Sequence, residues 1–292
     1  MQYVIFGATG YIGSYIFRQL KQDGQYVIGT SRHKYSIEDE TVIYDILEDS
    51  PDYLISKISD VDRVAVVCIA ESNIDRCLEN YSSAYRVNVI RTKDLIHTLS
   101  MSGFRVIFFS SDQVFDGTQG NYTEESERNP INKYGMMKKE IEDYLLLNEP
   151  EACILRIPKV VSTLRKRQNV LSEWTDKIDT GRTCCIRGNR LSFVSMDDIY
   201  RICRIVAEKR LKGLFNIAGD KAYGRAELAW IFYDKLGVDQ MEIKECDVEE
   251  FHFKENRPLN LSMSNAKFKI ETGYMFESMD SVIDRYITNL KK

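Results

Sequence analysis

The chain has 292 residues, of which 43% are hydrophobic and 29% charged, with 40 basic residues against 44 acidic ones. This composition is that of a globular protein and excludes disordered, collagen-like and low-complexity chains. No basic stripe is present and no apolar run approaches the roughly 18 residues of a membrane span, so we expect neither a nucleic-acid nor a membrane partner.

Cysteine and histidine usage bears on the compartment and on metal chemistry. The seven cysteines show no CxxC spacing, and no secretory signal precedes the first apolar run, so we expect reduced thiols and a cytoplasmic location. The three histidines are far apart in the sequence, so we predict no metal site and no histidine-based triad.

Short apolar runs alternate with amphipathic stretches through the first half of the chain. The predicted strands are 3–6, 26–30, 41–44, 64–70, 105–110 and 153–157. The predicted helices are 11–23, 48–59, 81–101 and 131–148, with a loop at 31–40. This alternation is typical of an α/β protein with a Rossmann-type, doubly wound parallel sheet.

The pattern becomes irregular after residue 158. Helices are predicted at 168–180, 196–209, 224–237 and 278–290, and strands at 183–186, 213–217 and 240–244. We predict an NAD(P)-binding domain at 1–158 and, at 159–292, a smaller C-terminal substrate-binding lobe. Part of this second region, about 190–217, is expected to return to the main sheet.

A glycine motif follows the first predicted strand, with the spacing GxxGxxG. Glycine allows a tight turn and lets the backbone approach a diphosphate at a helix N-terminus. An ordinary strand-to-helix turn is the alternative, but the position at the start of a βαβ series favours dinucleotide binding. The expected contacts are Gly7, Thr9, Gly10, Tyr11, Ile12 and Gly13.

The end of the second predicted strand indicates which dinucleotide is bound. Ser31 and Arg32 stand where an NAD-preferring site usually has an acidic residue, and they suit a 2′-phosphate. NADP(H) is therefore favoured over NAD(H), the alternative being a solvated surface arginine. Asp45 and Ile46 follow the third strand and are expected at the adenine, with a helix cap as the alternative role of Asp45.

Tyr134 and Lys138 are four residues apart and share one face of the predicted helix at 131–148. Tyr53 and Lys57 have the same spacing, but only Tyr134 follows a strand that ends in serine, at the edge where ligands of open α/β sheets bind. Ser111 would hold a substrate oxygen, Tyr134 would exchange a proton, and Lys138 would favour the ionised phenol.

Two further details concern the same helix and its surroundings. Asn129 and Pro130 are expected to supply its cap and first position. Asn88 is expected to support the site, with a surface amide as the alternative.

These motifs together resemble the extended short-chain dehydrogenase/reductase family, and in particular its dTDP-4-dehydrorhamnose reductase subgroup. The segments that carry the resemblance are GATGYIG at 7–13, AYRVNV at 84–89, SSDQVFDG at 110–117, YGMMK at 134–138, ILR at 154–156 and RPLNLSMSNAK at 257–267. Gln113 and the segments 68–71 and 157–162 depart from the subgroup's pattern. The resemblance implies catalytic roles for Ser111, Tyr134 and Lys138, and further cofactor contacts at Ile69, Ala70, Tyr134 and Lys138.

The expected function is NADPH-dependent reduction of a 4-keto-6-deoxy nucleotide sugar, with Tyr134 as the proton donor. Ser111 and Arg257 are the expected substrate contacts, Arg257 through the diphosphate or, alternatively, through a salt bridge within the lobe. Two other functions stay open: a nucleotide-sugar epimerase or dehydratase, and a non-catalytic NADP-binding regulatory subunit. The resemblance also implies a homodimer.

Overall fold

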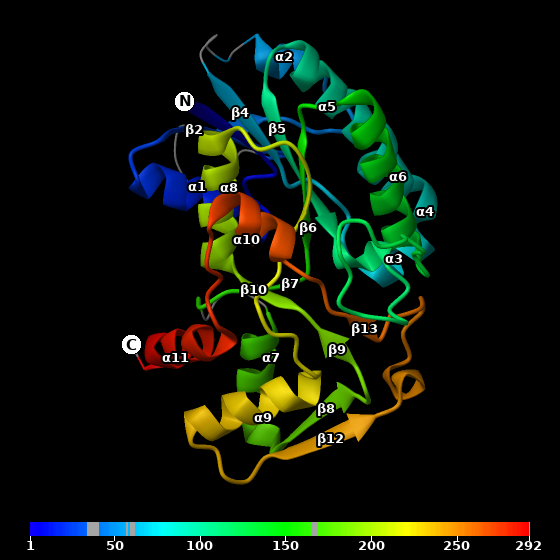
Figure 1. Ribbon diagram of the computed structural model, residues 1–292, viewed down its shortest axis with the longest axis vertical. Coiled ribbons are helices and arrows are strands. Elements are labelled where there is room, and N and C mark those ends of the chain that lie inside the picture. The colour runs from blue at the N-terminus through cyan, green and yellow to red at the C-terminus, as the bar shows by residue number, and fades with distance from the viewer. Residues whose placement is uncertain (34–40, 57, 59–61, 165–168, 292) are drawn as a thin grey trace.

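The computed structural model describes residues 1–33, 41–56, 58, 62–164 and 169–291. Within these residues the main body is a seven-stranded sheet between two layers of helices (Figure 1). In spatial order the strands are β11 (Gly213–Asn216), β6 (Cys153–Ile157), β5 (Arg105–Ser111), β4 (Arg63–Val67), β1 (Gln2–Phe6), β2 (Tyr26–Ser31) and β3 (Thr41–Ile43). Every neighbouring pair is parallel. The doubly wound order confirms the predicted fold class.

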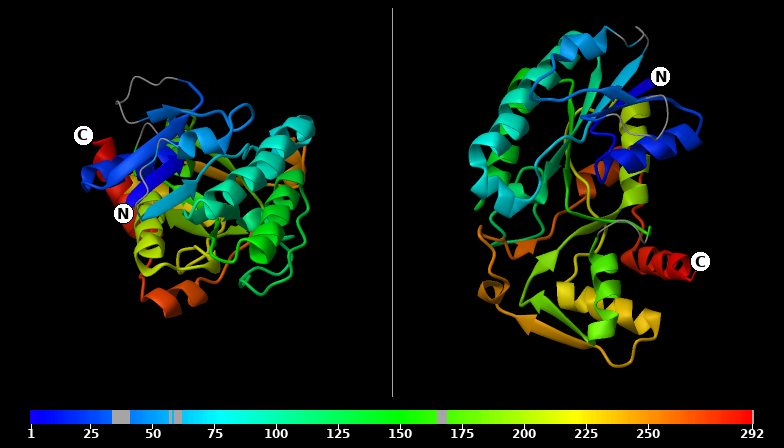
Figure 2. Two further views of the ribbon diagram at one scale, coloured as in Figure 1. Left: turned by 90° about the horizontal axis from the view of Figure 1, so that it is seen from above. Right: turned by 180° about the vertical axis from the view of Figure 1, so that it is seen from behind.

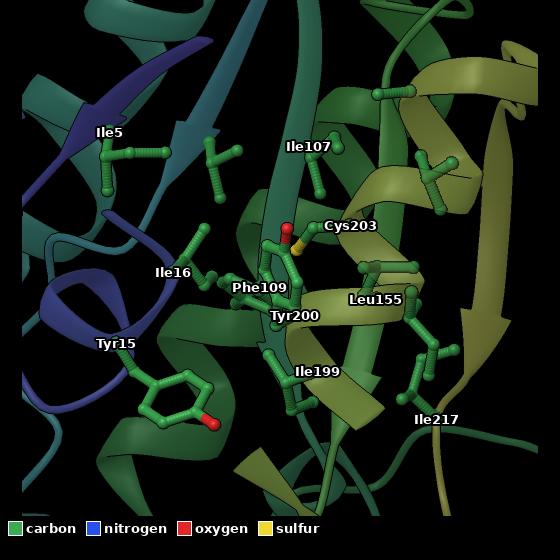
Figure 3. Packing of buried hydrophobic residues seen from close by; sticks show 14 of the residues in the cluster. Ile5, Tyr15, Ile16, Ile107, Phe109, Leu155, Ile199, Tyr200, Cys203 and Ile217 are labelled. Atoms are coloured by element: carbon green, nitrogen blue, oxygen red, sulfur yellow. The ribbon is translucent and has the colours of Figure 1, made fainter. Parts of the chain in front are cut away.

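Each central strand is buried on both faces, because alternate side chains enter two separate cores. Tyr3 and Ile5 pack with helices α1 (Gly13–Gln22) and α8 (Met196–Lys209), and Figure 3 shows Ile5 and Ile16 in this core. Val4 and Phe6 face the layer of α5 (Thr92–Met101) and α6 (Lys133–Asn148). The two layers lie on opposite sides of the sheet in both views of Figure 2.

A smaller group of elements lies beyond the carboxyl ends of the strands, in the lower part of Figure 1. It has its own apolar core and three two-stranded parallel pairs in the described residues. Its strands are β7 (Lys159–Val161), β8 (Arg182–Ile186), β9 (Arg190–Leu191), β10 (Phe193–Ser195), β12 (Glu242–Cys246) and β13 (Asn260–Leu261). Its helices are α7 (Val170–Asp176), α9 (Arg225–Leu236) and α11 (Met279–Leu290).

The chain returns to the main sheet late, when β11 pairs with β6 after α8 has covered one face. Helix α10 (Ala266–Thr272) packs on this edge, with the Phe268 and Phe215 rings 5.6 Å apart. None of the helices in the described part of the chain is long and apolar enough to cross a membrane. The division of the chain at residue 158 stays a prediction.

Several predicted elements differ from the observed ones. The strand predicted at 64–70 ends at Val67, and the helix predicted at 48–59 is the short α2 (Pro51–Ile55), capped by Ser50. The helix predicted at 81–101 is interrupted: α4 (Tyr81–Tyr85) and α5 flank a π-helical segment, Arg86–Arg91, and α3 (Ile74–Glu79) precedes them. Residues 34–40, 57 and 59, on which parts of the predictions fall, lie outside the described residues.

Candidate functional site

The glycine motif forms a turn between β1 and α1 that side chains would block. Gly7 has φ +87°, and its N–H donates to the Thr30 hydroxyl at 3.1 Å. A Cβ on Gly13 would lie 2.3 Å from the Gly7 carbonyl oxygen, well inside van der Waals contact. The backbone therefore comes close enough at this turn to hold a diphosphate against the start of α1.

A cavity of about 410 Å³ opens beside this turn, at the carboxyl ends of β1, β2 and β4. The predicted cofactor contacts that line it are Gly7, Thr9, Gly10, Ser31, Arg32, Asp45, Ile46, Ile69 and Ala70. Tyr11, Ile12, Gly13, Tyr134 and Lys138 do not line it. The structure thus brings nine of the predicted contacts from four separate segments to one cavity.

Four of these contacts lie at or just after the ends of β2 and β3, where the adenine end of the cofactor is expected. The Ser31 hydroxyl donates to the His33 carbonyl at 2.8 Å, and Arg32 is exposed beside it. Asp45 accepts the Leu47 N–H at 2.9 Å at the start of a turn, and it is not a helix cap, because Ser50 caps the helix α2 that follows. The Ile46 side chain is buried under the cavity. An exposed arginine at this position can approach a 2′-phosphate without first breaking an ion pair.

Sequence reasoning missed the wall formed by the second helical layer. The further lining residues include Leu47, Arg76, Asn80, Ser83 and Val87. Arg76, Asn80 and Ser83 belong to no motif with a recognisable spacing. They reach the cavity only because α3 and α4 lie beside the edge of the sheet.

Asn88 holds the loop that follows β4 in place. Its side-chain amide donates to the Glu71 carbonyl and accepts the Glu71 N–H, each at 2.8 Å. The residue is buried and lies in the π-helical segment. Because Ile69, Ala70 and Glu71 line the cavity, Asn88 supports the cavity wall rather than lying at the surface as a free amide.

Tyr134 and Lys138 lie on α6 facing the end of β5. The helix is capped by Asn132, whose side-chain oxygen accepts the Gly135 N–H at 2.8 Å, so the predicted cap at Asn129 and Pro130 is wrong. The Lys138 ammonium donates to the Phe109 carbonyl at 2.7 Å and lies 5.8 Å from the centre of the Tyr134 ring. The Ser111 hydroxyl lies close enough to the Tyr134 phenol to lower its pKa. The three predicted catalytic side chains therefore meet.

Burial sets the protonation of these groups. It raises the pKa of the Tyr134 phenol, which the nearby Asp112 carboxylate raises further, while the Ser111 hydroxyl lowers it. Burial also lowers the pKa of Lys138 to about 8, against the opposing charge of Glu142. At neutral pH the phenol is thus held in its protonated form beside a lysine that is close to its titration range.

Gln113 links the serine strand to the helix that carries the tyrosine. Asp112 accepts hydrogen bonds from the Ser111 hydroxyl at 3.1 Å and from the Gln113 amide at 3.3 Å. The Gln113 side-chain oxygen accepts from the Asn132 amide at 3.0 Å. Gln113, which departs from the subgroup's pattern, thereby ties the Ser111 end of β5 to the cap of α6.

A second cavity, of about 500 Å³, lies among β7, α7 and α9. It is lined by Lys159, Val160, Asn169, Val170, Glu173, Asp176, Lys177, Leu191, Phe193 and Arg225. Lys159 follows β6, whose last residue, Ile157, pairs in register with Ser111. The cavity therefore opens from the same sheet edge as the Ser111 and Tyr134 hydroxyls.

Arg257 lines neither cavity. Its guanidinium donates to Asp75 of α3 at 2.8 Å and to the Glu255 carbonyl at 2.9 Å, and it lies 4.4 Å from the centre of the Phe253 ring. This ion pair joins the late segment to α3, across the two groups of elements. In the described residues no group of three or more His, Cys, Asp or Glu side chains is arranged to hold a metal ion.

A doubly wound sheet with a glycine turn at one strand end, and serine, tyrosine and lysine side chains at the neighbouring ends, defines an extended short-chain dehydrogenase/reductase. The model of the family described as the RmlD substrate binding domain matches residues 1–292. The chain belongs to this family.

Solved structures of similar fold are sugar-nucleotide enzymes. A dTDP-4-dehydrorhamnose reductase from Clostridium acetobutylicum aligns with a TM-score of 0.88 and 24% identity over all of both chains. The enzyme of that name from Bacillus anthracis, in complex with NADP, gives 0.86 and 16% over 98% of each chain. Thermotoga maritima UDP-glucose 4-epimerase with UDP-glucose gives 0.83 and 18% over 100% of this chain and 99% of that chain.

The curated relatives include a protein that is named as a subunit as well as one that is named as a reductase. Methionine adenosyltransferase 2 subunit beta from Bos taurus is 27% identical over 256 residues, which is 82% of this chain and 74% of that protein. A probable low-salt glycan biosynthesis reductase from Haloferax volcanii is 32% identical over 162 residues, 52% of this chain and 51% of that protein. The sequence relatives thus include both a reductase and a subunit.

Proposed function

We propose that the chain is an NADPH-dependent reductase of a nucleotide sugar with a keto group, of the 4-keto-6-deoxy class. The observation that carries this proposal is the approach of Ser111, Tyr134 and Lys138 to one another at the carboxyl end of β5. One cavity has the glycine turn of a dinucleotide site, and the other is large enough for a sugar with its attached groups.

The first cavity fits a dinucleotide cofactor. Glycine at 7 and 13 lets the turn and the start of α1 pack closely together, Gly7, Thr9 and Gly10 of this turn line the cavity, and Ile46, Ile69 and Ala70 offer apolar contacts. Arg32 and Ser31 favour NADP(H) over NAD(H), in agreement with the NADP complex of the Bacillus anthracis enzyme. A nicotinamide cofactor bound there would supply the hydride.

The side chains of the chain itself would handle the proton. Ser111 would donate a hydrogen bond to the substrate keto oxygen and hold it against Tyr134. Because burial and Asp112 raise the pKa of the Tyr134 phenol, Tyr134 is a protonated acid at neutral pH, ready to give its proton to the oxygen as negative charge develops. Lys138, when charged, would stabilise the phenolate that is left behind.

A specific observation also favours a non-catalytic regulatory subunit as the second candidate function. The relatives named methionine adenosyltransferase 2 subunit beta cover most of this chain. In addition, the Lys138 ammonium donates to the Phe109 carbonyl, and the charges around Tyr134 include Asp112 and Glu71, both of which disfavour a phenolate. Such a chain would bind NADP and turn nothing over. An epimerase or dehydratase would instead regenerate its cofactor within each turnover.

The test is NADPH oxidation followed at its absorbance band with a panel of 4-keto-6-deoxy nucleotide sugars, beside binding titrations of NADPH and NADH. We expect steady consumption with one member of the panel. Tight NADPH binding with no consumption, together with unchanged sugars in the product analysis, would contradict the reductase and support the subunit. A rearranged sugar without net consumption would support the epimerase or dehydratase.

A further inference from the structure

The second cavity carries more positive charge than its own residues neutralise. Three cations line it, Lys159, Lys177 and Arg225, against the two carboxylates Glu173 and Asp176. Glu173 is already engaged, because the Arg225 guanidinium contacts it at 2.5 Å. The cavity therefore has an excess of cationic groups near β7.

Among the described residues, the ammonium of Lys159 has no hydrogen-bond or ion-pair partner, and Lys159 is the unpaired cation of the cavity that lies nearest to Asp112. Its side chain is reached by solvent through the cavity, although protein surrounds it closely enough for desolvation to lower its pKa. No hydrogen bond or ion pair joins its ammonium to any other residue in the described ranges, and Asp112 and Glu173 act on it only through their charge. An ammonium that is exposed to the cavity and has no partner among the described residues is free to bind an anion that enters it.

Arg225 supplies a second unused donor. Its Nε is buried and has no hydrogen-bond partner among the described residues, while its Nη2 binds Glu173. Buried donors in native proteins are nearly always paired, so an unpaired one in a cavity wall indicates a missing acceptor. The Arg225 guanidinium lies close enough to Lys159 for its charge to lower the pKa of the Lys159 ammonium.

The register of the main sheet shows where the Lys159 ammonium lies relative to Ser111. Ile157 pairs in register with Ser111, and Lys159 comes two residues later, about 7 Å farther along an extended chain. The Asp112 carboxylate that acts on Lys159 also accepts the Ser111 hydroxyl. The ammonium thus lies near the proposed reaction centre, at the end of the cavity where the sugar rather than the base would lie.

We propose that Lys159 and Arg225 form an anion-binding site for the substrate, so that the sugar nucleotide is recognised by a negatively charged group close to the reacting ring. This rests on the proposed function in naming the ligand a sugar nucleotide. The diphosphate and, if the sugar is a uronate in place of the 6-deoxy sugar proposed above, a carboxylate on the ring share the required chemistry, because both present charged oxygens to an ammonium and a guanidinium.

Binding measured by calorimetry without NADPH tests this site apart from turnover. The probes are inorganic pyrophosphate, UDP-glucose and UDP-glucuronate, and the proteins are wild type, Lys159→Met, Lys159→Arg and the control Lys212→Met. Lys212 is an exposed lysine paired with Glu151 and lines neither cavity. Circular dichroism and the melting temperature verify that each variant is folded.

Two results would support the site, and they distinguish whether the sugar or the diphosphate carries the charge that it binds. If the sugar carries the charge, wild type binds UDP-glucuronate about 10- to 100-fold more tightly than UDP-glucose, and Lys159→Met removes that difference. If the diphosphate carries it, Lys159→Met weakens all three probes by a similar factor. In both cases Lys159→Arg restores most of the affinity, and Lys212→Met binds like wild type.

Two results would overturn the site: Lys159→Met binding every probe as wild type does, or wild type binding none of them. These outcomes are independent of the reductase. If Lys159→Met weakens binding but the wild-type protein consumes no NADPH, only the proposed function is contradicted. If the wild-type protein consumes NADPH and Lys159→Met leaves the KM for the sugar nucleotide unchanged, only the anion site is contradicted.

Discussion

The backbone carbonyl oxygen of Gln113 lies where a side chain on Gly135 would begin. A Cβ at position 135 would be 2.0 Å from that oxygen and 2.9 Å from Pro130. Helix α6 can therefore start against the end of β5 only with glycine after Tyr134. This contact sets the distance between Tyr134 and Ser111.

Gly135→Ala is expected to push the start of α6 away from Gln113. Overpacking of this kind costs about 1–3 kcal/mol of unfolding free energy, and the displaced phenol should lower kcat by at least 10-fold. Chemical denaturation and steady-state kinetics measure the two effects. Gly224→Ala is the matched control, because its Cβ would meet only ordinary contacts. Equal losses in the two variants would contradict the proposed role of the Gly135 contact.

Asp112 is expected to make stability fall as pH rises from about 4 to 6. Burial raises its pKa from 3.8 to about 6, so the folded state binds a proton in this range that the unfolded state has lost. The stabilising contribution is present below pH 4 and is lost as pH rises through 6, by about 3 kcal/mol in total.

Asp112→Asn removes this titration and keeps the oxygen that accepts from Ser111 and Gln113. Unfolding free energies of wild type and Asp112→Asn should therefore diverge between pH 4 and 6, with the variant the more stable at pH 7. Asp116→Asn is the contrasting control, because hydrogen bonds from Tyr122 and Thr118 lower the pKa of Asp116 and give the opposite sign. Parallel pH curves for wild type and Asp112→Asn would refute the prediction.

Glu142 and Arg156 form a bidentate ion pair in the core, with bonds of 2.9 and 2.8 Å and no exposed surface. Glu142→Gln leaves the guanidinium charge uncompensated and should cost about 3–5 kcal/mol. The double variant Glu142→Gln/Arg156→Met should lose less than the single one, because it removes the buried charge. Glu208→Gln, which breaks the exposed pair with Arg204, should cost under about 1 kcal/mol. A double variant less stable than the single one would contradict this account.

Arg32 is expected to decide the cofactor preference. Removing a charged contact to a 2′-phosphate costs about 10- to 100-fold in affinity. Arg32→Ala should weaken NADPH binding by that factor and leave NADH binding unchanged, as measured by fluorescence titration. Arg18→Ala is the control, since Arg18 lies on α1, donates to the Ser14 carbonyl and does not line the cavity. An equal loss of affinity for NADPH and NADH would show that Arg32 does not contact a 2′-phosphate.

The strands of the main sheet and its fold class could be predicted from the sequence, because apolar runs that alternate with amphipathic stretches are local patterns. Apolar runs such as Val64–Val67 are long enough to be buried on both faces, and the glycine motif marks where β1 meets α1. The two-residue strands β9 and β13 are too short to show periodicity, so only their pairing in space reveals them.

Site residues that directly follow a strand could be predicted from the sequence. Features that depend on contacts between distant segments could not. Ser31, Arg32 and Asp45 reach the cavity because carboxyl ends of parallel strands meet at one edge. Asn132 rather than Asn129 caps α6, because the Gln113 side chain and the Asn256 carbonyl hold the Asn132 amide. The break in the helix at 81–101 arises at Asn88, whose amide is bound to the distant Glu71 backbone.

The most direct test of the proposed chemistry is the rate of NADPH oxidation by Tyr134→Phe and wild type on the substrate that wild type consumes, with NADPH binding measured in both. Phenylalanine keeps the ring and removes only the proton that Tyr134 would donate. We predict a rate 10²- to 10⁴-fold lower with NADPH affinity retained. A Tyr134→Phe protein that reduces the sugar at the wild-type rate would contradict the assignment of Tyr134 as the proton donor.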